Sequence, residues 1–597
     1  MKFMKVFWAA LAAVVVGGIL SSLLWVITIF SLAGAVGTTA VNVMPNSILR
    51  IDLADNITDA PSVNPLAGVD FQTMQTTRNL TLLNVLRAIE AAKSDTRIKG
   101  IYINFSGGGS LSVAALEEMR AAIADFKQSG KFVVAFNDTY SQMGYYLASV
   151  ADKVYIQPEG SFSWVGAATT SLFFKEALDR LDISVEVFRP TVCKYKSAVE
   201  PYVLSKMSEA NRRQMEALCR DVWDVVCDAV SESRGIDRGE LNRLADRLAV
   251  TFPEDALKHK FVDGILYRDQ MEEVFAELGV EKGLLGDYEM VSLGDYCTIV
   301  GADMSNLSAP KVAIVYAEGQ IIDGEGIDDV VYGTTMAETL ASVRKDESVK
   351  SVVLRVNSPG GSALASDVIW REVELLKAVK PVIVSMGAYA ASGGYYISCP
   401  ADAILADRLT LTGSIGVYGM MLDGEDMLRR KLGITTDVVK TNPSADFGAN
   451  ILGLNVRRST PQERNMLLRS VDKVYHSFTT KVASGRNLPL NRVLEIAEGR
   501  VWSGTAAVGI GLVDGNGGLR EAISLAADKA GIADNFRVEE VLDEMTPFAA
   551  FMQAFGAQAR SLILGEELSQ VCDEYAATQH VMLMEGVQTF CPYRIVF

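Results

Sequence analysis

The hydrophobic and polar positions of the chain follow two periods, one typical of strands and one typical of helices. Short apolar runs at Ile101–Phe105 and Phe132–Phe136 predict strands, and helical apolar spacing near Leu116–Phe126 predicts a helix between them. A strand, a turn, a helix and a second strand in this order favour parallel pairing with right-handed crossovers. The pattern therefore indicates an α/β fold.

The same order of elements recurs in the second half of the chain. Apolar runs at Val352–Val356 and Val382–Ser385 predict strands on either side of a helix over about Ala365–Val379. Three sets of residues match at offsets of 251, 250 and 251, namely Lys99 with Lys350, Tyr145-Tyr146 with Tyr395-Tyr396, and Leu181 with Leu432. Independent matches at one offset indicate an internal duplication.

The duplication divides the chain into regions. Ser, Asn and Pro cluster near Asn306–Pro310, ahead of a predicted strand at Val312–Tyr316, so we expect the boundary between the repeats there. This gives an N-terminal repeat over residues 47–305 and a C-terminal repeat over residues 311–540. Residues 541–597 form a tail with helical apolar spacing, whose role the sequence leaves open.

The N-terminus carries a long uncharged segment. Lys2 and Lys5 precede it, no further charge occurs before Arg50, and Val6–Val36 is almost wholly apolar. About 30 residues at roughly 1.5 Å each exceed the thickness of a bilayer core, whereas a cleavable signal peptide has an apolar run of only about 7–15 residues. We therefore predict an uncleaved transmembrane anchor over residues 6–36, with a late-cleaved leader as the alternative. The lysines place the N-terminus in the cytoplasm and the remaining chain on the outer face.

The amino-acid composition argues against several classes of function. The 597 residues contain 56 Lys and Arg against 73 Asp and Glu, a net charge of −17, which argues against binding to nucleic acid phosphates. Seven cysteines show no CxxC or zinc-ligand spacing. Three scattered histidines are too few for a His-rich metal site, and the one in the second repeat, His476, lies in a charged helical stretch where we expect it to be solvated. No metal or organic cofactor is predicted.

A candidate nucleophile lies in the second repeat. The run Ser385–Gly394 is rich in small residues and lies between a predicted strand and a predicted helix over Tyr395–Cys399. At such a strand-to-helix turn, Ser392 would meet the backbone amides of a helix N-terminus, which suit a developing oxyanion. Alignment on the tyrosine pairs places Gln142 of the first repeat opposite Ser392, and Met143 opposite Gly393, so the first copy is expected to lack the nucleophile.

The candidate base comes from the other repeat. A lysine can replace histidine if burial disfavours its charged form, and lowering such a pKa from about 10.4 to about 7 corresponds to roughly 4–5 kcal/mol. Lys196 lies in the segment Cys193–Pro201 of the first repeat, whereas its counterpart over Thr441–Phe447 has no lysine after Lys440. One copy therefore has the hydroxyl and the other has the amine.

Four motifs together resemble the signal peptide peptidase A (protease IV) family in its long, duplicated form. The motifs are Asn357–Gly361, Ser385–Tyr396, Thr410–Gly416 and Tyr195–Pro201. The resemblance implies a Clp-protease/crotonase-like fold in each of two tandem repeats. It also implies that Ser392 is the nucleophile and Lys196 the general base, that Ser414 orients the lysine, and that the amides of Gly361 and Gly393 form the oxyanion hole. A plain turn at Gly361 and a helix cap at Ser414 stay open as structural alternatives.

The resemblance implies a membrane-anchored serine endopeptidase that hydrolyses hydrophobic peptides, such as signal peptides that remain after secretion. It would be a single-pass protein of the bacterial inner membrane with its catalytic body on the periplasmic face. The family's ring-like assemblies imply a homo-oligomer, with a tetramer suspected. Two alternatives remain, which are a catalytically inactive membrane scaffold and a crotonase-type acyl-CoA enzyme.

Overall fold

A computed structural model describes most of the two predicted repeats. The described residues are 42–52, 56–64, 69–70, 75–76, 79–104, 111–301, 308–327, 330–451, 453–542 and 588–590. The predicted anchor at 6–36, part of the predicted repeat boundary and most of the tail lie outside them. Among the described residues, no helix has the length and apolar character needed to cross a bilayer.

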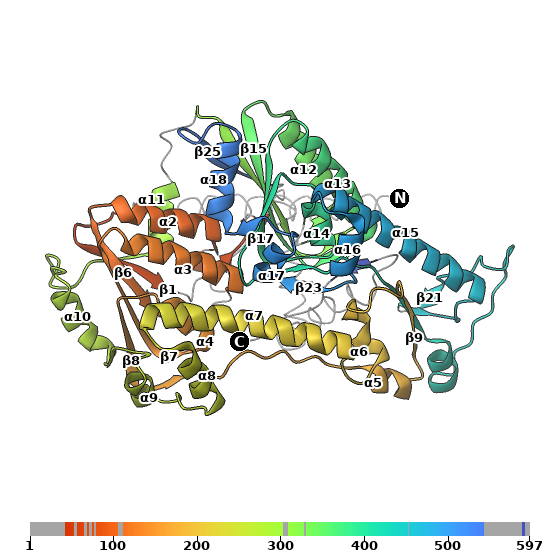
Figure 1. Cartoon of the computed structure of the whole chain (residues 1–597), viewed down its shortest axis with the longest axis horizontal. Helices are drawn as coiled ribbons and strands as arrows, with labels where there is room; N and C mark the ends of the chain where they lie inside the picture. Colours follow the sequence, from red (N-terminus) through yellow and green to blue (C-terminus); the bar gives the residue numbers. More distant parts are fainter. Residues whose placement is uncertain are drawn as a thin grey trace, which may run out of the picture.

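The first repeat forms a six-stranded sheet in which every pair of neighbours is parallel. Helices α2 (Leu82–Ser94) and α3 (Val113–Lys127) pack against each other beside it (Figure 1). In spatial order, the strands are β10 (Gly264–Ile265), β8 (Lys153–Phe162), β7 (Phe132–Tyr140), β6 (Ile98–Asn104), β1 (Ser47–Asp52) and β11 (Met290–Ser292).

The second repeat forms a sheet of the same design. Helices α12 (Gly333–Lys345) and α13 (Ala363–Lys377) pack on each other beside it, and only its β19–β23 pair is antiparallel. In spatial order, the strands are β23 (Val501–Ser503), β19 (Leu411–Gly413), β17 (Val382–Ala391), β15 (Val349–Ser358), β12 (Lys311–Glu318) and β25 (Arg537–Val541), while β18 (Ala403–Ala406) pairs with β17 and with β24 (Gly515–Asn516).

The two sheets confirm the predicted α/β class. Helices α2 and α12 begin at residues 82 and 333, which are 251 apart, and α3 and α13 begin at 113 and 363, which are 250 apart. The predicted strand Val382–Ser385 continues to Ala391, because Tyr389–Ala391 pair with Leu411–Gly413 of β19. The predicted helix Tyr395–Cys399 begins two residues earlier, as α14 (Gly393–Ser398).

Part of the first repeat lies with the second. Strand β9 (Ser184–Phe188) pairs antiparallel with β20 (Gly419–Asp423) over its whole length. Helix α7 (Glu209–Arg234) then runs across the lower half of the molecule, from α6 (Glu200–Val203) back to the first sheet (Figure 1). The chain between residues 184 and 203, which contains Lys196, is therefore placed beside the second repeat.

Smaller elements complete the fold. A four-stranded sheet has the order β14 (Val331–Tyr332), β13 (Ile321–Ile322), β16 (Gly360–Ser362) and β26 (Gln588–Phe590). The strands β21 (Asn450–Ile451) and β22 (Leu454–Asn455) extend β20, while β2 (Asn56–Thr58) pairs with β5 (Asn79–Thr81) and β3 (Val69–Asp70) pairs with β4 (Gln75–Thr76). The further helices are α4 (Gln142–Ala148), α5 (Lys175–Arg180), α8 (Arg238–Asp246), α9 (Pro253–Lys258), α10 (Met271–Glu277), α11 (Leu293–Gly301), α15 (Pro461–Gly485), α16 (Leu490–Ile496), α17 (Gly504–Gly509) and α18 (Leu519–Lys529).

The core is continuous between the repeats. Central strands read as unbroken Val/Ile runs because both faces of a parallel sheet are covered. One cluster of buried side chains combines Leu86 and Ile123 of the first repeat with Val353 and Ile383 of the second, and Leu519 of α18 belongs to it as well. Sliding one repeat against the other would expose this shared apolar surface.

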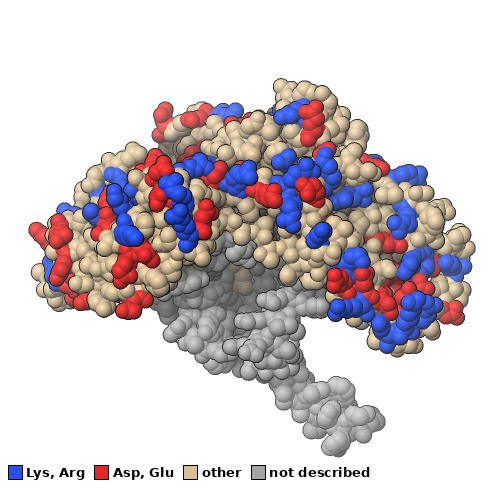
Figure 2. Space-filling view, turned by 60° about the horizontal axis from the view of Figure 1, so that its bottom comes forward, with Lys and Arg blue, Asp and Glu red and all other residues tan. Residues whose placement is uncertain are grey.

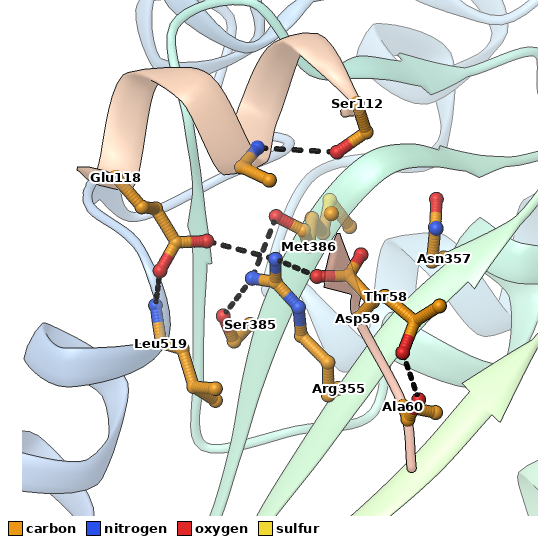
Figure 3. Close-up of polar contacts among 12 residues, drawn as sticks. Thr58, Asp59, Ala60, Ser112, Glu118, Arg355, Asn357, Ser385, Met386 and Leu519 are labelled. Atoms are coloured by element: carbon orange, nitrogen blue, oxygen red, sulfur yellow. Dashed lines mark hydrogen bonds and ion pairs between the residues drawn. The ribbon is translucent and has the colours of Figure 1, made fainter. Parts of the chain in front are cut away.

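A buried ionic cluster also joins the repeats (Figure 3). The Nη2 atom of Arg355, on β15, donates to Asp59 Oδ1 and to Glu118 Oε1, each at 2.8 Å. Its Nη1 atom donates to Ser385 Oγ at 2.8 Å, and Glu118 also accepts the amide of Leu519 at 2.6 Å. The side chain of Arg355 is only 1% exposed. Asp59 and Glu118 belong to the first repeat, so this cluster fixes the relative position of the two.

This cluster contains more carboxyl groups than guanidinium groups. Burial raises the pKa of Glu118, and it raises the pKa of Asp407 well above its ordinary value, where the neighbouring Glu118 and Glu117 carboxylates add to the effect. The positive charge of Arg355 opposes this rise in pKa at both carboxyl groups.

Charged side chains of both signs are distributed over the surface. In Figure 2, Lys and Arg are interspersed with Asp and Glu, and neither sign forms a continuous patch on the face shown.

The five described cysteines, Cys193, Cys219, Cys227, Cys297 and Cys399, are free thiols, and only Cys219 is not buried. Burial raises the pKa of the Cys193 thiol to about 11, which makes it a poor nucleophile.

Candidate active site

Ser392 occupies the sharp turn between β17 and α14. It has φ +58° and ψ −112°, a conformation that L-residues rarely adopt and that costs on the order of 1–3 kcal/mol. The hydroxyl makes no capping hydrogen bond to its own helix, while the Ser392 amide donates to Gly413 O at 2.8 Å. The residue is fully buried. The strained turn therefore holds the hydroxyl away from α14 and available to another group.

That group is the amine of Lys196. Its Nζ lies 2.6 Å from Ser392 Oγ, 2.9 Å from Ser414 Oγ and 3.1 Å from Ser414 O. Lys196 is 1% exposed. These three oxygens belong to two hydroxyl groups and one backbone carbonyl, and all three are uncharged.

The backbone of Lys196 is held by elements from both repeats. Arg189 Nη1 donates to Lys196 O at 2.7 Å, and the amide of Tyr195 donates to Glu498 O at 3.1 Å. Gly499 has φ +77°, and a Cβ added there would lie 2.5 Å from Lys196 Cβ. Only glycine permits this close approach. The loop around residue 499 thereby sets how far the lysine reaches toward Ser392.

Ser414 contacts the amine of Lys196 through both its hydroxyl and its carbonyl oxygen. It has φ +49°, and its amide donates to Arg500 O at 2.6 Å. Its hydroxyl donates to Gly499 O at 3.5 Å, which leaves an Oγ lone pair directed to Lys196. The helix-cap alternative for Ser414 does not hold, since its hydroxyl contacts Lys196 and Gly499.

The two glycines expected at the oxyanion hole lie on adjacent elements. Gly393 is the first residue of α14, where backbone amides have no partner within the helix. Gly361 is the middle residue of β16, which packs against α14. Gly361 has φ +158°, and an added Cβ would lie 1.9 Å from Ile321 O, so the position requires glycine. It lies in a strand pair and not in a plain turn.

The first repeat corrects one detail of the sequence alignment. The N-cap of α4 is Ser141, so the helix caps align Ser141, and not Gln142, with Ser392. The alignment on the tyrosines is shifted by one residue because α4 begins with an additional residue. Ser141 has an ordinary φ of −69°, and its Oγ accepts the amide of Gly144 at 3.1 Å.

Gln142 is the first residue of α4, one position after Ser141. Its Oε1 accepts the amides of Val165 and Gly166, each at 3.0 Å, and its Nε2 donates to Gly166 O at 3.0 Å. The side chain is 2% exposed. The side-chain amide of Gln142 is therefore held by backbone groups of the first repeat.

The structure also shows where His476 lies and which residues near the site the sequence analysis missed. His476 lies on α15 and is exposed, as predicted. Reasoning from sequence did not find Arg189, Gly499 or the ionic cluster around Arg355. Gly499 carries no signal beyond being a glycine after Glu498, and the carboxylate partners of Arg355 are more than 200 residues away in the chain.

The chain matches known proteins over most of its length. The sequence model of peptidase family S49 matches residues 125–281 and 374–533. Protease 4 of Salmonella typhi is 34% identical over 86% of this chain and 83% of that protein. Protease 4 of Haemophilus influenzae is 36% identical over 75% of this chain and 73% of that protein, and the chloroplastic serine protease SPPA of Arabidopsis thaliana is 31% identical over 83% and 73%.

These matches define the class of the protein as a serine protease, out of the three function classes that the sequence left open. The chain belongs to peptidase family S49, and the resemblance drawn from the four motifs is confirmed. Among solved structures, a ClpP1 mutant from Listeria monocytogenes matches 36% of this chain and 94% of that chain at 13% identity, with a TM-score of 0.23.

Proposed function

We propose that the protein is a Ser-Lys endopeptidase in which Ser392 is the nucleophile and Lys196 is the general base. The observation that carries the proposal is the 2.6 Å separation of Lys196 Nζ and Ser392 Oγ inside the buried site. This distance suits direct proton transfer between a nucleophile and its base.

The contacts of Lys196 Nζ support transfer of the proton from Ser392 Oγ to Nζ. A neutral amine has two N–H donors and one lone pair. If both donors are directed to the two oxygens of Ser414, the lone pair faces the hydroxyl of Ser392. Ser414 is then a positioning residue, because it fixes the orientation of the amine without contacting the substrate.

The reaction follows from these roles. Ser392 Oγ attacks the substrate carbonyl and its proton passes to Lys196 Nζ, while the amides of Gly393 and Gly361 stabilise the oxyanion. The C–N bond breaks as Nζ returns the proton to the leaving amine, which gives an ester on Ser392. Water, deprotonated by the same amine, then hydrolyses the ester and releases the carboxylic acid product.

We further propose that the chain is anchored in the bacterial inner membrane through residues 6–36, with its catalytic body outside the cytoplasm. A site near a bilayer favours hydrophobic peptides, such as remnant signal peptides, as substrates. The same proposal gives each repeat a Clp-protease/crotonase-like fold. It also makes the protein a homo-oligomer, for which a tetramer is suspected. Resistance of the full chain to alkaline carbonate extraction, lost when residues 1–41 are deleted, tests the anchor.

A serine-directed fluorophosphonate probe and a hydrophobic peptide test the dyad. The full chain is expected to be labelled and active, while Ser392→Ala and Lys196→Ala lose both properties. Ser398→Ala, a buried serine on the same helix, and Lys194→Ala, an exposed lysine paired with Glu498, serve as matched controls that keep both. Labelling of Ser392→Ala at the rate of the unaltered chain contradicts the assignment.

A further inference from the structure

A tight turn at the edge of the first sheet presents two leucines to solvent. The turn lies between α10 and β11, and it is closed by hydrogen bonds from the Gly286 amide to Gly283 O at 3.0 Å and from the Gly283 amide to Asp287 O at 2.8 Å. Leu284 and Leu285 are its two central residues, and Leu284 is fully exposed while Leu285 is 91% exposed. The turn therefore holds an apolar tip away from the body of the protein, and residues 283–286 are called the leucine tip below.

The turn itself does not require these leucines. Central positions of tight turns favour Gly, Pro, Asn, Asp and Ser, which supply the backbone conformation or a local hydrogen bond. Leu284 and Leu285 supply neither, and their exposure shows that they bury almost no surface within the fold. An apolar pair that departs from the local rule in this way indicates a role outside the fold.

The leucine tip lies beside the point where the chain arrives from the proposed membrane anchor. Asn46 Nδ2 donates to Glu281 Oε2 at 3.4 Å, and the amide of Ile48 donates to Glu289 O at 2.9 Å, so both sides of the tip contact the start of β1. Asn46 follows Val36, the last residue of the anchor, by ten residues, which span at most about 35 Å when fully extended. An anchor that ends at residue 36 therefore places the bilayer within this distance of the base of the tip.

Other apolar groups lie at the same edge of the sheet. Met44 precedes β1 and is 41% exposed, and Met290, the first residue of β11, is 40% exposed. Tyr288 is half-buried between the tip and β11. Tyrosine is enriched where lipid headgroups meet the hydrocarbon core, because its ring is apolar and its hydroxyl is polar. The edge around the tip thus suits the boundary between lipid and water.

The charges next to the tip show which kind of attraction to lipid is available. Lys282 is the only basic residue of the turn and its flanks, and its Nζ is paired with Glu272 Oε2 at 2.7 Å. The acidic residues Glu281, Asp287 and Glu289 outnumber it. Such a surrounding does not attract anionic headgroups, so burial of the leucines has to supply the attraction.

We propose that the leucine tip inserts into the surface of the membrane that holds the anchor, so that the catalytic body contacts the bilayer at a second point. The inference rests on the proposed anchor and goes beyond it, because a single span leaves the body free to rotate about the connecting residues. Leu284 and Leu285 enter the boundary between headgroups and acyl chains, while the acidic residues at the base of the turn stay in water. This second contact fixes the orientation of the body relative to the bilayer.

Brominated lipids report whether the tip enters a bilayer. The full chain carrying Leu284→Trp is reconstituted into phosphatidylcholine vesicles with and without bromine on the acyl chains, since bromine quenches tryptophan only at close contact. After subtraction of the emission of the unaltered chain, the added tryptophan is expected to lose about half of its fluorescence in brominated lipid, because interfacial insertion places it at the depth of the upper acyl chains.

Val439→Trp is the matched control for this measurement. Val439 is also apolar and fully exposed, but it lies on the segment that precedes β21, and β21 and α10 mark opposite ends of the molecule (Figure 1). Its tryptophan is expected to keep its emission. Quenching at residue 284 that does not exceed quenching at residue 439 overturns the proposal. A rise in quenching at residue 284 when anionic phosphatidylglycerol replaces part of the phosphatidylcholine contradicts insertion by the leucines.

Retention in the vesicles separates this inference from the anchor. The unaltered chain and the double variant Leu284→Asp/Leu285→Asp are both expected to stay in the vesicles after alkaline carbonate extraction, because the span alone holds them. Extraction of the unaltered chain contradicts the anchor, and this inference with it. Retention without quenching at residue 284 contradicts the tip contact and leaves the anchor standing.

The competing occupant of the tip is a second copy of the chain. Light scattering of the detergent-solubilised full chain measures the mass of its assembly, and the double variant Leu284→Asp/Leu285→Asp is expected to give the same mass as the unaltered chain. A smaller assembly for the variant assigns the leucines to a contact between copies and overturns the bilayer contact.

Discussion

The guanidinium of Arg355 is the most informative position at which to test how the repeats are held together. It contacts one carboxylate on each of two first-repeat segments, together with Ser385 Oγ of its own repeat, and it is almost completely buried. Substitution Arg355→Met keeps much of the side-chain volume and removes the charge. It leaves Glu118 and Asp59 buried without their cation.

The size of the effect follows from the proton that Glu118 must then bind. From an ordinary pKa of 4.5, protonating one carboxyl at pH 7 costs about 3.4 kcal/mol, and the lost hydrogen bond to Ser385 adds about 1 kcal/mol. The expected destabilisation is about 4–5 kcal/mol at pH 7, in the range found for broken buried ion pairs. At pH 5 the protonation costs only about 0.7 kcal/mol, so the total falls to about 2 kcal/mol.

Urea denaturation of the unaltered chain and of Arg355→Met at pH 7 and pH 5 measures both values. Arg344→Met is the matched control, since its ion pair with Glu372 at 3.3 Å is partly exposed and lies within the second repeat. Its loss is expected to stay below about 1 kcal/mol. Adding Glu118→Gln to Arg355→Met should restore about half of the lost stability at pH 7. The reasoning fails if Arg355→Met loses less than 1 kcal/mol at pH 7, or if its loss is equal at the two pH values.

Three further predictions concern the site and its surroundings. Lys196→Arg should lower kcat on a hydrophobic peptide by about 10³-fold or more, because a guanidinium does not release its proton near neutral pH; measurable turnover close to that of the unaltered chain would rule out lysine as the base. Gly499→Ala should lower kcat by more than about tenfold, because its Cβ would lie 2.5 Å from Lys196 Cβ, whereas Gly433→Ala, also at positive φ but with open space around it, should cost only about 1 kcal/mol of stability and leave kcat unchanged. Burial raises the pKa of Glu318 to about 7 from 4.5, so its contribution is most favourable below pH 4.5 and about 3 kcal/mol is lost as the pH rises to 7; Glu318→Gln should remove this part of the pH dependence in urea denaturation, and identical pH profiles for the two proteins would refute the shift.

The sequence carried enough information for the strands, the helices and the duplication because these depend on local hydrophobic periodicity. The strand β17 was predicted too short, because Gly387 and the alanines that follow lack the β-branched side chains that mark a strand. Pairing of Tyr389–Ala391 with β19 determines that part of the strand, and such pairing is not visible in a local window.

The sequence predicts the residues of the candidate site but not the contacts that hold those residues in place. Ser392 and Lys196 stand in motifs that a family resemblance can identify, and the structure brings them together at 2.6 Å. The close approach of Gly499 and the pairing of β26 with β16 depend on contacts between segments more than 200 residues apart. No periodicity or spacing within a segment encodes such contacts, so they become visible only in the folded chain.

The division of the site between the repeats has a physical consequence for how the enzyme is controlled. Lys196 reaches Ser392 only because β9 pairs with β20 and because the Arg355 cluster and the shared core hold the repeats together. A displacement of about 1 Å at such a contact would cost about 10²-fold in rate, so we expect loosened repeats to lower the activity of the proposed dyad before the chain unfolds. The proposed catalytic site thereby depends on the interface between the repeats.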